Sequence, residues 1–523
     1  MTVKNKKPIA QALLVLLVSI AVPANTPQSE RFVEFWGSRY APQPGVDLEP
    51  RFGLQVEIPN APSPGATPAI LRWNAISIDA SGLDHTPVAP GENRVFGEQV
   101  GPCRAARAIA IVHIAMFEAL NSIVGGFNSY VRLEKKGVPA SQDAAIAQAA
   151  HDTLVVLWPS QRASFDQRLA QDLALISDVQ LKANGITIGN RAARAILALR
   201  NGDGSQIPEP RVNIDFIPSN DAGHWRQDPI SHHPLALGAY WDQVTPFVMF
   251  SSSQFRVPPP PPMNSAAYTE AFNEAKRLGG DGVHTSTERT AEQTQIAIYW
   301  GYDGTPSLCA PPRLYNQIAV HIANQMGTRG INLARLLALA NTAMADAGIA
   351  IWESKYFYQF WRPITGIRES DPGTGPSGTG DGNAETTGDP VCMPLGAPAS
   401  NLMGPNFTPP FPSYPSGHAG FGGALFQVLR DFYGTDNVPF TFTSDEFNGV
   451  TRDNAGNVRP LIPRSFSTLS QAEEENGQSR IYLGIHWSFD KTEGIAQGRN
   501  IGHFVFKRAF TPLPVTGSTT PKK

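Results

Sequence analysis

From residue 101 onward, apolar residues recur at spacings of three and four positions, which is the pattern of helices with a buried face. The segment 103–123 is apolar almost all round between Ala108 and Phe117 and follows Pro102, a residue favoured in the first turn of a helix. It is therefore predicted to be a buried central helix. Alternating runs typical of strands are scarce and short.

The same periodicity predicts two groups of helices, separated by an irregular segment over 203–262 that ends in the proline run Pro258–Pro262. Ser141 and Ser160 are placed as N-caps of helices in the first group. The predicted helices cover 103–123, 141–158, 160–176, 179–200, 264–279, 286–304, 311–327 and 332–367, with further helices starting near Pro415, Phe466 and Asp490. We expect an all-α fold of two helical bundles packed together, with long irregular loops.

Irregular composition marks the rest of the chain. Residues 25–100 are rich in Pro and Gly, so we expect a mostly irregular N-terminal segment with one helix over 69–80. A second long loop is expected over 369–412, where Gly, Pro, Asp and Thr dominate. The expected organisation is a leader over 1–24, the irregular segment over 25–100, an N-terminal helical half with linker over 101–262, and a C-terminal bundle over 263–511.

The first 24 residues have the pattern of a secretory signal peptide. Lys4, Lys6 and Lys7 precede an apolar run, and small residues end at Ala24, where cleavage is expected. No other stretch is expected to be apolar and long enough to span a membrane, so the mature protein is predicted to be exported and soluble. A formal net charge of −3 over 523 residues gives no sign of nucleic acid as a partner.

Isolated cysteines and histidines give no metal site. The three cysteines, at 103, 309 and 392, are too widely spaced for a CxxC motif and allow at most one disulfide. His232 and His233 lack a third ligand at metal spacing, so both are expected on a surface loop.

Three short blocks in the C-terminal third carry the candidate chemistry. In the first, Lys355 and Arg362 are seven residues apart on one predicted helix, which places both side chains on the same face until Pro363 disturbs the helix. In the second, Ser416, Gly417 and His418 open a helix, where free backbone N–H groups and the helix dipole favour an anion.

The third block contains Arg480, His486 and Asp490. A spacing of four lets the Asp490 carboxylate accept a hydrogen bond from one ring nitrogen of His486 and leaves the other nitrogen free as ligand or nucleophile. If the blocks converge, three positive charges surround one small site, which is more than a protein core buries without a ligand. The pattern therefore predicts a pocket for a tetrahedral oxyanion.

Occurring together in this order, the blocks resemble the vanadium-dependent haloperoxidases, which share a helical fold and an anion pocket with type 2 phosphatidic acid phosphatases and bacterial acid phosphatases. Further similarity, closest to the fungal chloroperoxidase branch, covers "RAARAIAIVHIAMFEALNSI", "YWGYDGTPSLCAPPRLYNQI" and "DAGIAIWESKYFYQFWRP". The matched motif positions are Lys355, Arg362, Pro363, Pro415, Ser416, Gly417, His418, Ser479, Arg480, His486 and Asp490.

The resemblance implies a role for each position. His486 would bind vanadate as its ligand to the metal, Asp490 would orient His486, and His418 would be the acid–base group. Asp303 would pair with a pocket arginine, and Trp352 and Phe411 would line the halide side. The groups holding the vanadate oxygens would be Lys355, Arg362, Ser416, the Gly417 amide and Arg480. The implied partners are hydrogen peroxide, a halide ion (chloride or bromide) and small organic acceptors.

Two alternatives stay open at this point. Phosphate fits the same pocket, so the chain could be an acid phosphatase in which His486 attacks phosphorus and His418 protonates the leaving oxygen. A non-catalytic oxyanion-binding protein is the second alternative. Trp352 and Phe411 favour the haloperoxidase.

Overall fold

The computed structural model describes residues 28–41, 62–89, 91–134 and 137–514. Within them the chain forms fourteen α-helices and one two-stranded antiparallel sheet, so the predicted all-α class is confirmed. The predicted leader over 1–24 lies outside the described residues.

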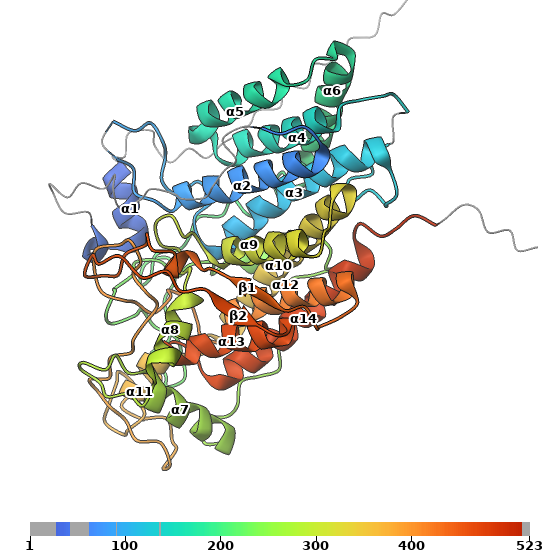
Figure 1. Ribbon diagram of the computed structural model, residues 1–523. Coiled ribbons are helices and arrows are strands. Elements are labelled where there is room, and N and C mark those ends of the chain that lie inside the picture. The colour runs from blue at the N-terminus through green and yellow to red at the C-terminus, as the bar shows by residue number, and fades with distance from the viewer. Residues whose placement is uncertain (1–27, 42–61, 90, 135–136, 515–523) are drawn as a thin grey trace, which may run out of the picture.

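The first group of helices gathers at one end of the molecule (Figure 1). It consists of α2 (Ala66–Asp84), α3 (Pro102–Val124), α4 (Gln142–Leu157), α5 (Arg162–Ala174) and α6 (Val179–Leu199). Ser141 caps α4 as predicted, since its side chain accepts from the backbone of Ala144. Ser160 does not cap α5: it lies in the 3₁₀ turn η3 (Pro159–Gln161) and its hydroxyl donates to Glu98 at 2.7 Å.

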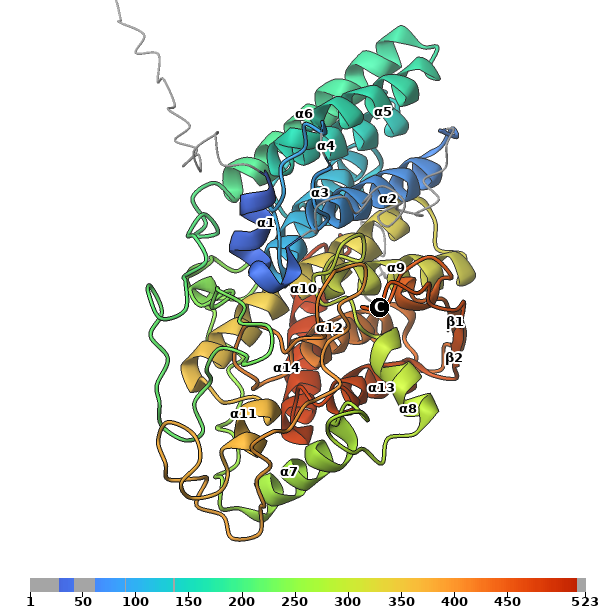
Figure 2. The ribbon, with the colours of Figure 1, turned by 90° about the vertical axis from the view of Figure 1, so that its left-hand side faces the viewer.

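The second group fills the other end of the molecule (Figures 1 and 2). The strands β1 (Phe440–Phe442) and β2 (Arg464–Phe466) pair beside it. The helices are α7 (Ala266–Gly279), α8 (Ala291–Tyr299), α9 (Pro311–Gln325), α10 (Gly330–Tyr358), α11 (Pro363–Arg368), α12 (Gly417–Tyr433), α13 (Leu469–Tyr482) and α14 (Ser488–Arg508).

The two groups meet where α3 packs along α10. Both helices are rich in apolar residues and almost entirely buried, and one continuous hydrophobic core runs through both groups. Both helices also have the length and hydropathy of a membrane span. The expectation that no stretch after the leader is apolar and long enough to span a membrane is therefore wrong on those two criteria. In the folded chain, 89% of the apolar window of α3 and all of that of α10 is buried inside the protein.

The N-terminal segment has more structure than expected. It contains α1 (Gln28–Trp36) as well as α2, whereas only one helix was predicted over 25–100. Three aromatic residues of α1 are buried against the main core. They are Phe32, Phe35 and Trp36, at spacings of three and one.

Two long segments without α-helix cover one side of the molecule (Figure 2). Residues 203–262 contain only the 3₁₀ turn η4 (Trp241–Gln243), and residues 369–416 contain no helix or strand. The two segments touch, since the Leu237 N–H donates to the Pro410 carbonyl at 2.9 Å. Together they cover the end of α10 that carries Lys355.

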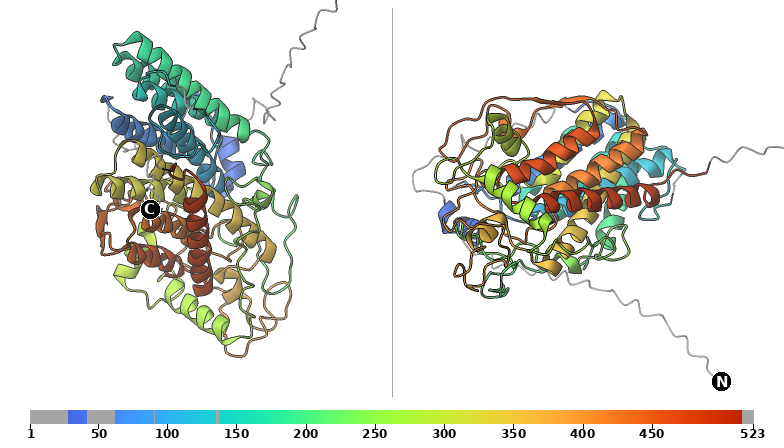
Figure 3. Two further views of the ribbon diagram at one scale, coloured as in Figure 1. Left: turned by 90° about the vertical axis from the view of Figure 1, so that its right-hand side faces the viewer. Right: turned by 90° about the horizontal axis from the view of Figure 1, so that it is seen from below.

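Helices α12 and α14 lie side by side (Figure 3) because glycines remove the side chains between them. A Cβ at Gly494 would lie 2.7 Å from the Ser416 carbonyl oxygen, well inside van der Waals contact. The close approach places the first turns of both helices at one point.

Candidate functional site

The start of α12 faces the start of α14. The Ser416 N–H donates to the Asp490 carbonyl at 2.9 Å, and the Ser416 side chain caps α12. Gly417 is the first helical residue, so its backbone N–H has no partner inside the helix. Ser416, Gly417 and His418 are all buried at this position.

Lys355 and Arg362 do not share a helix, so the prediction that places both on one helix is wrong. The helix α10 ends at Tyr358, Gln359 adopts a left-handed conformation (φ 48°), and Arg362 is the residue before α11. The physical reason is Pro363, which disfavours helical geometry at the residue before it.

The two cations nevertheless converge, because both bind the same short stretch of backbone. Lys355 Nζ donates to the carbonyls of Pro412 and Ser413, each at 2.8 Å. Arg362 Nε donates to the Phe411 carbonyl at 3.0 Å. Both side chains are buried, at 0% and 1% exposed.

Arg480, at the end of α13, pairs with Asp303. Its Nη2 lies 2.7 and 2.8 Å from the two carboxylate oxygens, and Nη1 reaches the Trp300 carbonyl at 3.4 Å. Burial raises the pKa of Asp303 above its ordinary value, and the Arg480 guanidinium opposes that rise. The expected pairing of Asp303 with a pocket arginine is present in the structure.

His486 is oriented by Asp490, with 2.8 Å between Nδ1 and the carboxylate. The contact is not made along a helix face, because His486 precedes α14 and Asp490 reaches back from its first turn. The Trp487 N–H at 3.0 Å and the Ser413 hydroxyl also donate to Asp490. Since a carboxylate accepts from Nδ1–H, Nε2 of His486 is the basic nitrogen, and Arg362 Nη1 lies 3.1 Å from it.

His418 has a fixed tautomer as well. Its Nε2 lies 2.6 Å from the Gly301 carbonyl, which can only accept, so Nε2 carries the proton and Nδ1 is the basic nitrogen. Burial lowers the pKa of both His418 and His486 well below the ordinary value. Arg480 adds to the lowering for His418, and Arg362 and Lys355 add to it for His486.

The charge of the site is unbalanced. Burial, followed by the neighbouring Arg362, lowers the pKa of Lys355 well below its usual range, and burial lowers that of Arg362 to about 9. Two guanidinium nitrogens, Nη2 of Arg362 and Nε of Arg480, are buried and have no hydrogen-bond partner among the described residues. Burial raises the pKa of the nearby Asp490 to about 6. Unused donors and crowded cations are the properties of a site that binds an anion.

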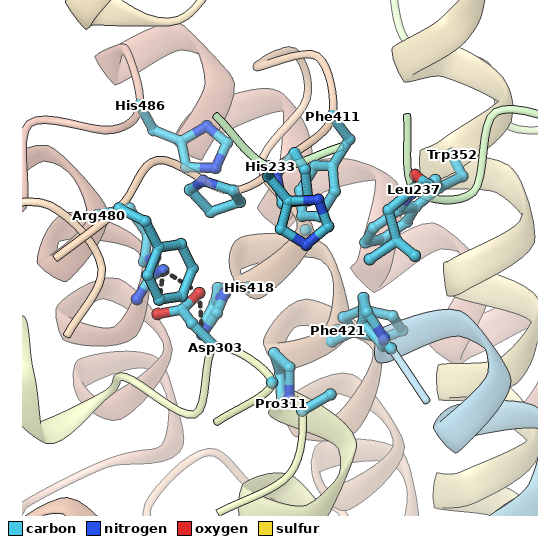
Figure 4. A pocket seen from close by; sticks show the side chains of 18 of the residues that line it. His233, Leu237, Asp303, Pro311, Trp352, Phe411, His418, Phe421, Arg480 and His486 are labelled. Carbon is cyan, nitrogen blue, oxygen red and sulfur yellow. Dashed lines mark hydrogen bonds and ion pairs between the residues drawn. The ribbon is translucent and has the colours of Figure 1, made fainter. Parts of the chain in front are cut away.

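The site opens into a pocket with an apolar wall (Figure 4). Trp352 and Phe411 lie together in that wall, with ring centroids 4.8 Å apart. Lys355 Nζ lies 5.7 Å from the Trp352 ring and 5.2 Å from the Phe411 ring. The structure therefore brings both expected pocket residues next to the cationic base.

Sequence reasoning missed part of this wall. Phe35 and Trp36 of α1 and Leu237 and His233 of the 203–262 segment also line the pocket. His233 is buried at 2% exposed, so its expected place on a surface loop is wrong. The aromatic spacing in "RFVEFW" was a usable signal for a buried helix, but nothing in the sequence places His233 beside residues 352–486.

Comparisons with known proteins show which family the chain resembles. A family model described as the VCPO second helical-bundle domain matches residues 335–513, a range that includes Lys355, Arg362, Arg480 and His486. The chain is 30% identical over 505 residues to the vanadium chloroperoxidase of Curvularia inaequalis, covering 80% of this chain and 78% of that protein.

Solved structures share the fold. The first bacterial vanadium-dependent iodoperoxidase aligns with a TM-score of 0.67 at 24% identity, covering 88% of this chain and 100% of that one. An apo-type bacterial vanadium-dependent chloroperoxidase aligns with a TM-score of 0.58 at 18% identity, covering 78% and 93%. At these identities the structural likeness concerns the fold alone.

Proposed function

Since this chain belongs to the vanadium haloperoxidase family, we propose that it binds vanadate and uses hydrogen peroxide to oxidise a halide, chloride or bromide, to hypohalous acid. The observation that carries the proposal is the buried cationic base, in which Arg362 Nη2 and Arg480 Nε have no described partner beside the basic Nε2 of His486. A small organic acceptor would then be halogenated.

The residues of this pocket fit a tetrahedral oxyanion. Lys355, Arg362 and Arg480 bring three cations against the carboxylates of Asp303 and Asp490, so one anion would relieve the surplus of positive charge. Ser416 and the backbone N–H of Gly417 would add donors at a helix start. His486 would supply the nitrogen ligand to the metal through Nε2. Bound there, vanadate supplies a Lewis-acid centre that activates peroxide without changing oxidation state.

The protein groups would then have separate tasks. Nδ1 of His418 would take a proton from the entering peroxide and return one later, since its Nε2–H is held by the Gly301 carbonyl. Asp490 would keep His486 in its Nδ1–H tautomer, and Asp303 would hold Arg480 in place. Lys355 would hold its charge beside Trp352 and Phe411, where it attracts the halide anion into an apolar wall.

Phosphoryl transfer is the second candidate, because His486 is a buried neutral imidazole whose Nε2 is oriented by a carboxylate, the arrangement of a nucleophile. In that reaction His418 would protonate the leaving oxygen. The apolar wall around Trp352 and Phe411 favours halide oxidation, since a phosphate ester leaving group needs no such cluster.

The test is a direct comparison of both activities. The protein is purified without phosphate, loaded with orthovanadate, and assayed for bromination and chlorination of a cyclic dione with peroxide; the vanadate-free protein is assayed on an aryl phosphate. We expect vanadate-dependent halogenation that inorganic phosphate inhibits by competition. Phosphate-ester hydrolysis without halogenation in vanadate-saturated protein would replace the first function with the second.

A further inference from the structure

Ser413 is a buried residue at the cationic base, and the proposed reaction gives its side chain no task. Its backbone is held on both sides, because the N–H donates to the Phe360 carbonyl at 2.9 Å and the carbonyl accepts from Lys355 Nζ at 2.8 Å. Its hydroxyl donates to Asp490 Oδ2 and lies 3.3 Å from Nδ1 of His486. The side chain therefore acts on the hydrogen bond that orients His486.

The donors around the Asp490 carboxylate all converge on one of its two oxygens. Oδ2 accepts from His486 Nδ1 at 2.8 Å, from the Trp487 N–H at 3.0 Å and from the Ser413 hydroxyl. Oδ1 is buried and has no hydrogen-bond partner among the described residues. Each donor neutralises part of the negative charge on the shared oxygen, so the Ser413 hydroxyl weakens the hydrogen bond that Oδ2 accepts from His486.

The strength of that hydrogen bond determines how well His486 donates electrons through its other nitrogen. A carboxylate that accepts from Nδ1–H makes Nε2 of the same ring more basic, and a weaker acceptor makes it less so. Nε2 faces the cationic base, 3.1 Å from Arg362 Nη1. A stronger nitrogen donor binds a metal more tightly and leaves that metal a weaker Lewis acid.

We propose that Ser413 is a positioning residue that acts through Asp490 and limits the electron donation of His486 Nε2 to a bound vanadate. The proposal rests on the proposed function for the identity of the oxyanion. The hydroxyl then lowers the affinity for vanadate and raises the rate of halide oxidation. The Ser413 carbonyl has a separate task, since it holds Lys355 whatever side chain stands at this position.

Proton NMR of protein with isotope-labelled histidine, free of vanadate and phosphate, tests the hydrogen bond itself. The Nδ1–H resonance of His486 is identified by its loss in His486→Gln. We expect this resonance to move downfield in Ser413→Ala, because the remaining hydrogen bond to Asp490 becomes stronger. It should stay at the wild-type position in Ser413→Thr, which keeps the hydroxyl. An unmoved or upfield resonance in Ser413→Ala overturns the proposal.

Vanadate titration and turnover test the consequence for the proposed reaction. Ser413→Ala is expected to bind orthovanadate about fivefold more tightly and to brominate the dione with a kcat about fivefold lower at saturating vanadate. Both values should stay within about twofold of the wild type in Ser413→Thr. Opposite changes in affinity and kcat distinguish this role from structural damage, which lowers both. Loss of both, or no change in either, overturns the proposal.

Two further variants complete the experiment. Ser122→Ala is the matched control, because it removes a buried hydroxyl that donates to the Ala119 carbonyl within α3. Its affinity and kcat should equal those of the wild type. If Ser413→Ala does not fold, Ser413→Cys takes its place, since a thiol is a weak donor. The same directions of change are expected, and values equal to the wild type overturn the proposal.

The two measurements also separate this proposal from the proposed function. If the wild type binds no vanadate, the proposed function fails. The Nδ1–H resonance then still decides whether the Ser413 hydroxyl weakens the hydrogen bond between His486 and Asp490.

Discussion

At the residue scale, the cations of this pocket are held mainly by neutral groups. Lys355 donates to two backbone carbonyls, and Arg362 donates to the carbonyls of Phe411 and Ile485 and to a neutral imidazole. Carbonyl dipoles orient a charge without cancelling it, whereas a carboxylate partner would remove the attraction for a ligand. Of the three cations, Arg480 alone has a direct carboxylate partner among the described residues, namely Asp303. The surplus charge is therefore built into the way the side chains are positioned.

Replacing His486 with Ala is expected to lower vanadate affinity by about 100-fold or more, since the nitrogen ligand to the metal is lost and Asp490 loses its partner. The measurement is titration of the phosphate-free protein with orthovanadate, with dione bromination as the readout. Retained affinity and activity would place the oxyanion elsewhere in the protein.

Replacing His418 with Ala is expected to separate binding from turnover. Vanadate affinity should stay within about tenfold of the wild type, because three cations and His486 remain, whereas kcat should fall by about 100-fold or more as the acid–base group is lost. The comparison uses kcat measured at saturating vanadate for both proteins. Equal losses of affinity and kcat would make His418 a ligand-holding residue.

At the element scale, periodicity located most helices well, and the errors fall where the backbone leaves the regular pattern. The predicted helix over 103–123 matches α3, and the one over 179–200 matches α6, each within two residues at either end. The predicted helix over 332–367 is in fact α10 and α11, separated by a left-handed residue that helical periodicity does not reveal. Apolar residues continue through the break because both helices are buried.

Substitutions of Gln359, at the break between α10 and α11, are expected to differ in their effect on stability. A β-branched residue is strongly disfavoured at φ 48°, so Gln359→Val should lower the free energy of unfolding by about 1–3 kcal/mol, whereas Gln359→Gly should not lower it. Urea denaturation of the three proteins is the measurement. A Val variant as stable as the Gly variant would contradict the left-handed conformation.

Asp346 joins α10 to the 203–262 segment by accepting the backbone N–H groups of Phe247, Val248 and Met249 at 2.6, 2.8 and 3.0 Å. In Asp346→Asn the amide N–H₂ faces one or two of these donors, so the free energy of unfolding should fall by about 1–3 kcal/mol. The loss should be largest near pH 4.

The pH dependence follows from the raised pKa. Burial raises the pKa of Asp346 from 3.8 to about 6, so the carboxyl group ionises at lower pH in the unfolded chain. The folded state then loses stability as the pH rises through this window, whereas Asn does not titrate. Urea denaturation at pH 4 and pH 7 measures the difference between the two proteins. A difference that grows toward pH 7 would contradict the assignment.

Like the helices, the candidate site has one part that the sequence predicts and one part that it does not. The base is made by short motifs whose residues keep fixed spacings, so Lys355, His418 and His486 could be named in advance. The wall at Phe35 and His233 comes from segments far away in sequence, and tertiary packing brings them there. Trp36 of α1 contacts Phe407, and Leu237 of the 203–262 segment donates to the Pro410 carbonyl. The contact between Asp490 and His486 was predicted from their spacing of four, and the structure makes it across the start of α14.

At the scale of the whole molecule, two helical groups share one core because α3 and α10 are buried on all sides. The pocket uses residues from both groups, since Gly101 and Pro102 lie at the start of α3 and the cations lie on the second group. A stable pocket therefore requires the two groups to be docked.

Export is the prediction that belongs to the full chain. Expression with the native N-terminus in a secreting host should release mature protein that begins at Asn25, because the basic, apolar and small-residue pattern ends at Ala24. Intact-mass measurement of the secreted protein identifies the cleavage site. Full-length protein retained in the cell would show that these residues are not a cleaved leader.

The separate origin of the pocket wall has a consequence for protein engineering. The three buried cations and the two histidines of the base lie between 355 and 486, whereas Phe35, Trp36, His233 and Leu237 belong to segments that could be recombined as cassettes. A library confined to these four positions would vary the pocket wall and keep the cationic base constant across every variant. Differences in activity among its members, measured with one fixed halide, would then report on the wall alone.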